Sequence, residues 1–250
     1  MTFPGSTGLT VLDVYDWVAP DGLPGGSAHV HLASTEGYLV ASGEGRLQTL
    51  GSSGYAETPL RPGDCLWFTP GTIHRLVNDG DLRLFVVMQN AGLPEHGDAV
   101  LTFGPEILAD PGRYAEAAAL PAPGGDDSAL AEAARRRAAL AVEGYLDLRA
   151  AVEEKGPALA LEDFYAAATA LRGPLVADWR ERWRDGALAT AELTRTHLDG
   201  IEAAAAGGSP EAAGHLAAGA LWRIGNPPGE RAYGMCGRLT TYPAGAAQRI

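Results

Sequence analysis

The stretch that decides the fold is GGSAHVHLASTEGYLVASG, residues 25–43. It places His29 and His31 two residues apart in a β-like run and puts Glu36 five residues further on. Because residues two apart in a strand point to the same face, the two imidazoles are expected to project together, while Val30 faces away. Glu36 falls where the chain has turned into the next strand, so its carboxylate can return to the same pocket.

A fourth candidate ligand, His74, lies in the stretch GDCLWFTPGTIHRLVN, residues 63–78, beyond a glycine-rich hairpin. Three imidazole nitrogens and one carboxylate oxygen suit one divalent transition metal, such as iron, manganese, nickel, cobalt or zinc, with positions left for water or substrate. A barrel that uses no metal is the alternative. The residues predicted to bind the metal are His29, His31, Glu36 and His74.

These two stretches resemble the two sequence motifs of the cupin superfamily. In that family the two histidines, the glutamate and the later histidine are the metal ligands, and each has a matching residue here. One departure is Thr69, where many relatives carry the first proline of a Pro-Pro-Gly turn. The resemblance covers roughly residues 9–105 and implies a double-stranded β-helix barrel. It says little about the reaction, because this fold supports many chemistries. Barrels of this family often pair through edge strands, so the resemblance also implies a homodimer.

The predicted fold class is a mainly β barrel followed by an α-helical C-terminal region. Strand signals separated by glycine-rich turns recur before Leu120, whereas alanine-rich helical periodicity follows Asp127. The predicted organisation is a barrel domain over residues 1–120, a Pro/Gly linker over 121–127 and a helical region over 128–250. A short strand is expected within residues 231–242. Trp179 and Trp183 lie four residues apart on one helix face, where core packing is favoured over a cover for the barrel mouth.

Composition excludes several classes of partner. The formal net charge is −12, and residues 1–120 carry 14 acidic against 5 basic side chains. Nucleic acid and anionic membranes are therefore not expected as partners. The N-terminal residues lack the features of a signal peptide, so a cytoplasmic location is expected. Cys65 and Cys236 are too few for a disulfide scaffold, and both are interpreted as reduced thiols, with Cys65 packed inside the barrel.

The predicted substrate is a small, mainly apolar organic molecule. Tyr38 and Val40 share their alternation with Glu36, so they are expected to line the cavity together with the strand over residues 82–89. Glu36 and Tyr38 are the candidate catalytic residues, since the carboxylate can also accept a substrate proton. The first functional hypothesis is a metal-dependent dioxygenase or related oxidoreductase. The alternatives are a metal-dependent isomerase or lyase and a non-catalytic cupin that binds a small molecule.

Overall fold

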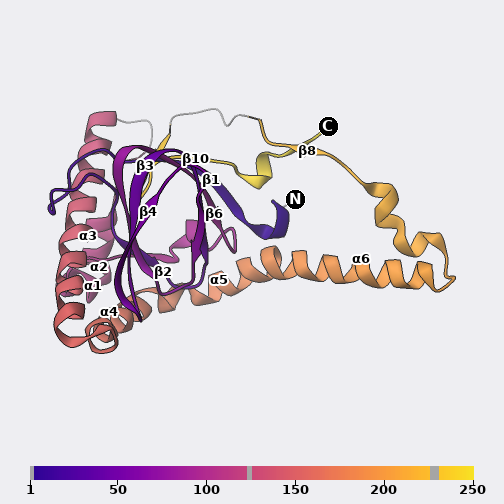
Figure 1. Cartoon of the computed structure of the whole chain (residues 1–250). Helices are drawn as coiled ribbons and strands as arrows, with labels where there is room; N and C mark the ends of the chain where they lie inside the picture. Colours follow the sequence, from indigo (N-terminus) through magenta and orange to yellow (C-terminus); the bar gives the residue numbers. More distant parts are fainter. Residues whose placement is uncertain (1–2, 123–125, 226–230) are drawn as a thin grey trace.

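The N-terminal half of the chain forms a β-barrel, and helices from the C-terminal half cover one side of it (Figure 1). This computed structural model describes residues 3–122, 126–225 and 231–250. No helix among those residues has the length and apolar character that crossing a membrane requires. The predicted fold class, a β-barrel followed by a helical region, is confirmed.

Nine strands form one sheet that curls into the barrel. The strands run in the order β4-β3-β6-β1-β10-β9, with β2 pairing β6 and β7, and β5 pairing β3. Their bounds are β1 Gly8–Val14, β2 His29–His31, β3 Glu36–Gly51, β4 Gly54–Leu60, β5 Cys65–Phe68, β6 Ile73–Met88, β7 Ala99–Leu101, β9 Ala232–Tyr233 and β10 Gly237–Thr241. A separate two-stranded sheet joins β8, Trp222–Arg223, to β11, Gln248–Arg249.

Strands β3 and β6 are each 16 residues long and run through stretches that resemble turns in the sequence. The sequence suggests breaks near residues 42–45 and 78–81, yet β3 and β6 run through them as antiparallel partners. The pairing of β3 with β6 continues through this stretch, and only its register shifts, between Val40 and Gly45. Gly43 makes this possible with a φ of 78°, because a Cβ there would lie 2.2 Å from the Asp81 carbonyl oxygen. The turn-like residues therefore mark a bulge that bends the barrel wall.

The helical elements follow the barrel strands in the chain. The α-helices are α1 Pro105–Leu108, α2 Pro111–Ala118, α3 Asp127–Lys155, α4 Pro157–Arg172, α5 Val176–Trp183 and α6 Ala189–Ala205. Short 3-10 helices are η1 Pro4–Ser6, η2 Pro94–His96, η3 Gly173–Leu175, η5 Pro210–Ala218 and η6 Ala244–Ala246, and η4, Arg184–Leu188, is a π-helical segment. The division at residues 121–127 remains a prediction; α3 already begins at Asp127, and residues 123–125 of the proposed linker lie outside the described residues.

Helices α3 and α4 share a hydrophobic core with the barrel. Tyr145 and Phe164 are buried in the same cluster as Leu101 and Phe103. Gly144 permits this approach, because a Cβ there would lie 2.0 Å from the Thr102 carbonyl oxygen. The first part of the helical region is therefore packed as part of the barrel's own fold. Helix α6 differs, because it extends past the barrel (Figure 1) and buries none of its residues.

The C-terminal segment returns to the barrel, and the short strand predicted within residues 231–242 is confirmed as β10. Strand β10 pairs antiparallel with β1, and Thr241 lies opposite Thr10. Backbone hydrogen bonds also tie the turn before β10 to the barrel, from the Ser27 amide to the Met235 carbonyl at 2.9 Å and from the Tyr15 amide to the Cys236 carbonyl at 3.1 Å. This turn reaches the region of the predicted metal ligands.

One cysteine is not where the sequence suggests. Cys65 is exposed on β5, so the prediction that it packs inside the barrel is wrong, while Cys236 is the buried thiol. The reason is register, because Cys65 lies opposite Leu39, which faces outward between the buried residues Tyr38 and Val40. Strand alternation therefore places Cys65 on the outer face.

Candidate metal centre

The four predicted ligands meet inside the barrel. His29 and His31 lie on β2, Glu36 is the first residue of β3, and His74 lies on β6 directly opposite His29 in the antiparallel register. All four are buried, and their candidate ligand atoms lie within 4.8 Å of one another. Glu36 Oε2 is 3.3 Å from His31 Nε2 and 3.1 Å from His74 Nε2. Among the described residues, this is the group of His, Cys, Asp and Glu side chains that is arranged to hold a metal ion.

Each imidazole is oriented by an acceptor on its Nδ1 side. His29 Nδ1 lies 3.2 Å from the Ser27 carbonyl oxygen, and His74 Nδ1 lies 3.0 Å from that of Thr72. In both cases the histidine bonds to the carbonyl two residues before it. These contacts favour the tautomer with a proton on Nδ1, which leaves the Nε2 lone pair directed at the centre of the site.

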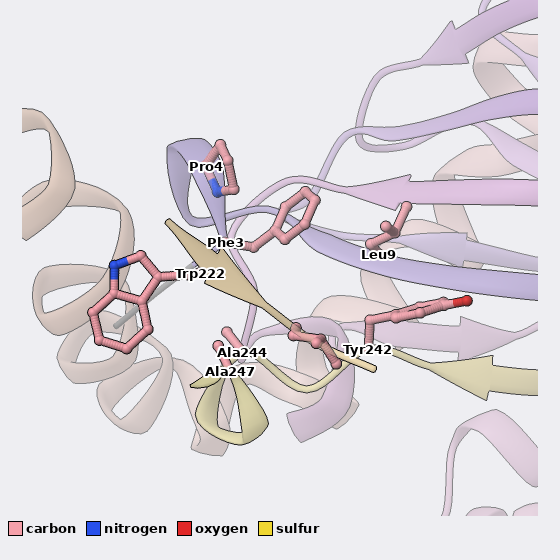
Figure 2. A pocket seen from close by; sticks show the side chains of 8 residues that line it. Phe3, Pro4, Leu9, Trp222, Tyr242, Ala244 and Ala247 are labelled. Atoms are coloured by element: carbon pink, nitrogen blue, oxygen red, sulfur yellow. The ribbon is translucent and has the colours of Figure 1, made fainter. Parts of the chain in front are cut away.

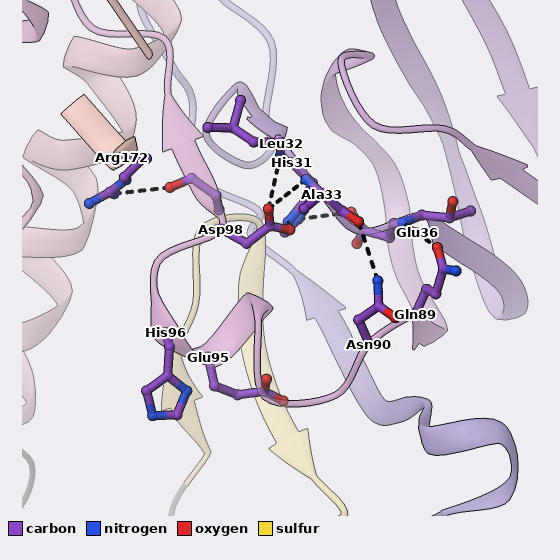
Figure 3. A network of polar contacts seen from close by, with 12 residues as sticks. His31, Leu32, Ala33, Glu36, Gln89, Asn90, Glu95, His96, Asp98 and Arg172 are labelled. Atoms are coloured by element: carbon purple, nitrogen blue, oxygen red, sulfur yellow. Dashed lines mark hydrogen bonds and ion pairs between the residues drawn. The ribbon is translucent and has the colours of Figure 1, made fainter. Parts of the chain in front are cut away.

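His31 is oriented by a side chain that the sequence analysis did not identify. Its Nδ1 lies 3.1 Å from Asp98 Oδ2 (Figure 3). The other carboxylate oxygen, Asp98 Oδ1, accepts the backbone N–H groups of Leu32 at 3.0 Å and Ala33 at 2.7 Å. Asp98 is fully buried immediately before β7, which pairs with β2. No motif marks this aspartate in the sequence, because the pairing of β7 with β2 alone brings it to His31.

Burial and the contacts between neighbouring titratable side chains determine which groups of the site carry a proton. Burial, together with His74 and His31, holds the pKa of His29 well below its usual value. Burial alone would lower the pKa of His31, but contacts with Asp98 and Glu36 raise it to about 9. Burial opposes the ionisation of Glu36, yet His31 and His74 keep its pKa well below the usual range. Without a metal ion, the site therefore holds one carboxylate charge and a proton on His31.

The donor set fits a divalent transition metal. Glu36 Oε2 and His74 Nε2 are buried, and neither makes a hydrogen bond within the described part of the chain. Unpaired polar atoms are costly in a protein interior, and here they face one another. A cation placed between them would satisfy both. His29, His31, Glu36 and His74 would hold it through three nitrogens and one oxygen, a set that suits Fe, Mn, Ni, Co or Zn.

The site opens into a cavity of about 240 Å³. Val86 and Met88 of β6 line it, as the sequence analysis expects for residues 82–89. The C-terminal segment supplies a wall that the sequence analysis missed, formed by Met235, Cys236, Leu239 and Thr241. The turn that carries Cys236 must approach closely, since a Cβ on Gly26 would lie 2.4 Å from the Cys236 Cα. Residues near the chain end therefore complete the cavity.

Tyr38 and Val40 do not line this cavity. Both are buried in the barrel core instead, with the Tyr38 ring packed edge-on against Phe68 at a centroid distance of 5.4 Å. Burial and the adjacent Glu36 carboxylate raise the pKa of Tyr38 well above its usual value. Tyr38 is thus a protonated neighbour of the candidate ligand Glu36.

The tryptophan pair also lies away from the cavity. Trp179 is buried, and its indole N–H donates to the His96 carbonyl oxygen at 2.9 Å. Trp183 is 42% exposed. Neither residue lines the cavity beside the candidate ligands. Core packing is therefore confirmed for Trp179, which packs against the segment before β7, and is wrong for Trp183, which is exposed.

Comparison with known proteins assigns the barrel to the family that its two sequence motifs resemble. Residues 17–88 match the family model of the cupin domain. This part of the chain is a cupin domain. A comparison with curated proteins finds no match for the chain. Asp98 and the Met235–Thr241 wall lie outside the matched residues, so the cupin domain obtains part of its site from elsewhere in the chain.

Solved structures of similar fold are distant in sequence. One is an uncharacterised conserved protein with a double-stranded β-helix domain from Klebsiella pneumoniae, 23% identical, with a TM-score of 0.26, covering 33% of this chain and 64% of that one. Another is a "predicted oxalate decarboxylase" from Thermotoga maritima, 21% identical, with a TM-score of 0.25 and the same coverage of 33% and 64%. A third is Fe(II)-HppE with an alternative substrate, 22% identical, with a TM-score of 0.27, covering 33% of this chain and 42% of that one. This chain thus spans less than two thirds of each.

Proposed function

We propose that this protein is a metal-dependent cupin enzyme, a dioxygenase or related oxidoreductase that acts on a small, mainly apolar organic molecule. The observation that carries the proposal is the convergence of His29, His31, Glu36 and His74 on one point at the wall of a cavity. A bound divalent ion would supply Lewis acidity and, if it is redox-active, the electrons that dioxygen chemistry needs.

The cavity supports a small substrate. Its volume of about 240 Å³ compares with roughly 30 Å³ for one water molecule in the liquid. Apolar side chains supply most of the wall beyond the ligands, and in the described residues no lysine or arginine lines it. A phosphorylated substrate would need such cations, so an uncharged or aromatic molecule fits better.

Glu36 and Tyr38 have different proposed roles in proton transfer. Glu36 is ionised in the site and is the only carboxylate among the four candidate ligands, so it is the proposed acceptor of a substrate proton. Tyr38 keeps its proton because burial and Glu36 raise its pKa. We therefore assign Tyr38 the role of holding a proton beside the Glu36 carboxylate, in place of lining the cavity.

The test is dioxygen uptake by metal-loaded protein against a panel of small aromatic and enolisable compounds. Turnover is expected to require dioxygen and to fall by about 10²–10⁴-fold in Glu36→Ala, the range for losing a general base. Glu153→Ala, which removes an exposed carboxylate of α3, is the matched control and should keep the wild-type rate. Both variants are compared at equal metal content.

Other outcomes would assign a different class. Full activity under strictly anaerobic conditions would make the enzyme a metal-dependent isomerase or lyase. Tight binding of a compound without turnover would favour a non-catalytic cupin. A Glu36→Ala protein that keeps both its metal and its rate would remove Glu36 from the mechanism.

A further inference from the structure

The outer face of the sheet carries two apolar rows that cross β6, β3 and β5. Residues that lie directly opposite each other in neighbouring strands project to the same face. The strand register therefore aligns one row as Phe85, Leu39 and Cys65, and the next as Val87, Gly37 and Trp67. Their chain neighbours Tyr38, Leu84 and Val86 point inward and are buried.

This outer face is exposed to an unusual degree for apolar side chains. Trp67 is 72% exposed, Leu39 43%, Val87 40% and Phe85 37%. Single exposed apolar residues are ordinary on protein surfaces, but a contiguous set across three strands marks an interaction surface. We call these four residues the outer patch.

The chain covers the adjoining part of the same face with its own termini. Leu9 lies opposite Val87 on β1 and therefore also points outward. It lines a cavity of about 620 Å³ together with Phe3, Trp222 and Tyr242, which come from the two terminal segments (Figure 2). That cover does not reach the outer patch, whose residues remain exposed.

We infer that the outer patch is the surface through which two copies of this chain pair face to face. The patch offers both parts of such a contact, because the highly exposed Trp67 forms one wall of a hollow of about 340 Å³ whose other walls include Gly37 and Val87. A two-fold axis between the copies would place each Trp67 in the hollow of the other. In such an interface the same residues serve both sides, which is the usual form of a protein dimer.

Charge favours this face over the exposed apolar residues of α6. The rows of the outer patch hold no charged side chain. The exposed Leu198 and Ile201 of α6 lie among three acidic side chains and one basic one, since Arg195 pairs with Glu192 and Asp199 while Glu202 adds a further negative charge. The chain carries a formal net charge of −12, so two copies repel wherever acidic faces approach. Pairing through α6 would bring two surfaces with an excess of negative charge together, while pairing through the uncharged rows of the outer patch would not.

The size of the patch suits the centre of an interface. An aromatic side chain buries roughly 150–250 Å² when it is covered, and most of Trp67 is still available. A standard interface buries about 800 Å² per partner, with apolar residues at its centre and polar residues around them. Thr7, Thr35 and Gln89 border the hollow on one side, and the Arg83–Asp13 ion pair lies on the other. These residues supply the polar rim.

The test is the mass of the full chain in solution, by size-exclusion chromatography with light scattering. Wild-type protein is expected at twice the mass of one chain, and Trp67→Arg at the mass of one chain. Leu198→Arg, which adds the same charge at an exposed apolar site on α6, should remain a dimer. Unchanged far-ultraviolet circular dichroism would show that Trp67→Arg is folded.

The thiol of Cys65 provides a second readout that needs no substitution. Cys65 is exposed in one copy and lies directly opposite Leu39 of the outer patch, whereas Cys236 is buried. Its reaction with a maleimide should slow as wild-type protein is concentrated and should not depend on concentration in Trp67→Arg. Wild-type protein at the mass of one chain, or a Trp67→Arg protein that remains a dimer, would overturn the inference. Dissociation by Leu198→Arg alone would assign the interface to α6 instead.

Discussion

Replacing Asp98 by Asn should weaken metal binding without removing a ligand. In the native site, one oxygen of Asp98 accepts the proton on His31 Nδ1, and the other accepts two backbone N–H groups. An amide offers one oxygen and one NH₂ group to the same three donors. Because the side chain is fully buried, no water can take over the missing contact.

The cost follows from the two ways in which the amide can be placed. If the NH₂ group faces Leu32 and Ala33, both N–H groups lose their side-chain acceptor. Leu32 keeps the backbone carbonyl of residue 98 at 3.2 Å, but Ala33 is left without an acceptor, at a cost of about 1–3 kcal/mol. If it faces His31, the imidazole must accept there and carry its proton on Nε2, the nitrogen that the metal needs. The arrangement in which the NH₂ group faces His31 destabilises the fold less, so the substitution lowers metal affinity more than it lowers stability. Removing a side chain that orients a ligand typically lowers metal affinity 10–100-fold, which is about 1.4–2.7 kcal/mol of binding free energy.

The assay is a competition titration of the metal between the protein and a chromogenic chelator. Asp98→Asn should show a dissociation constant about 10–100-fold above that of the wild type. Asp178→Asn, which removes an exposed carboxylate paired with Arg182 on α5, should match the wild type. Wild-type affinity in Asp98→Asn would refute the argument that Asp98 fixes the tautomer of His31.

Three further predictions concern the shared core, the chain end and pH. Phe164→Ala should lower the free energy of unfolding, measured by urea titration, by about 3–5 kcal/mol. The control Leu159→Ala changes an exposed residue and should lower it by less than about 0.5 kcal/mol. Equal losses in the two variants would contradict the shared core. A chain ending at Gly125 should aggregate and fail to retain metal, because it lacks β10 and the helical half of the core; a monodisperse, metal-loaded product would make the two parts separable. The His31 pKa of about 9 exceeds its unfolded value of 6.5, so His31 stabilises the metal-free fold fully below pH 6.5 and loses that effect as pH rises through 9. Because the ion competes with this proton, metal affinity should rise about tenfold from pH 7 to pH 8, and a flat profile in calorimetric titrations would contradict that assignment.

The cluster of candidate ligands could be predicted from the sequence because its residues lie in two short stretches with fixed spacing. His29 and His31 share a strand face through their separation alone, and Glu36 follows within one turn. The barrel was also predictable, because the alternation of strand residues and the glycine-rich turns between them are local signals. These features depend on residues that are near one another in the chain.

The parts that escaped prediction depend on pairing between distant segments. Asp98 reaches His31 only through the register of β7 with β2, and Met235 reaches the cavity only through the pairing of β10 with β1. Strand alternation correctly groups Tyr38 with Glu36 on the inner face, but the Tyr38 ring packs in the core beside Phe68, a residue of another strand. Cys65 faces outward because of the β3–β5 register, which its own stretch does not reveal.

The measurement that tests the central claim most directly is the metal content of the purified and reconstituted chain, by elemental analysis. Wild-type protein should bind one ion per chain, and His74→Ala should lose most of it, because His74 is fully buried with its Nε2 facing Glu36. His96→Ala, which removes an exposed histidine outside the site, should bind as much metal as the wild type. Failure of the intact protein to bind iron, manganese, nickel, cobalt or zinc, or full metal content in His74→Ala, would contradict the account.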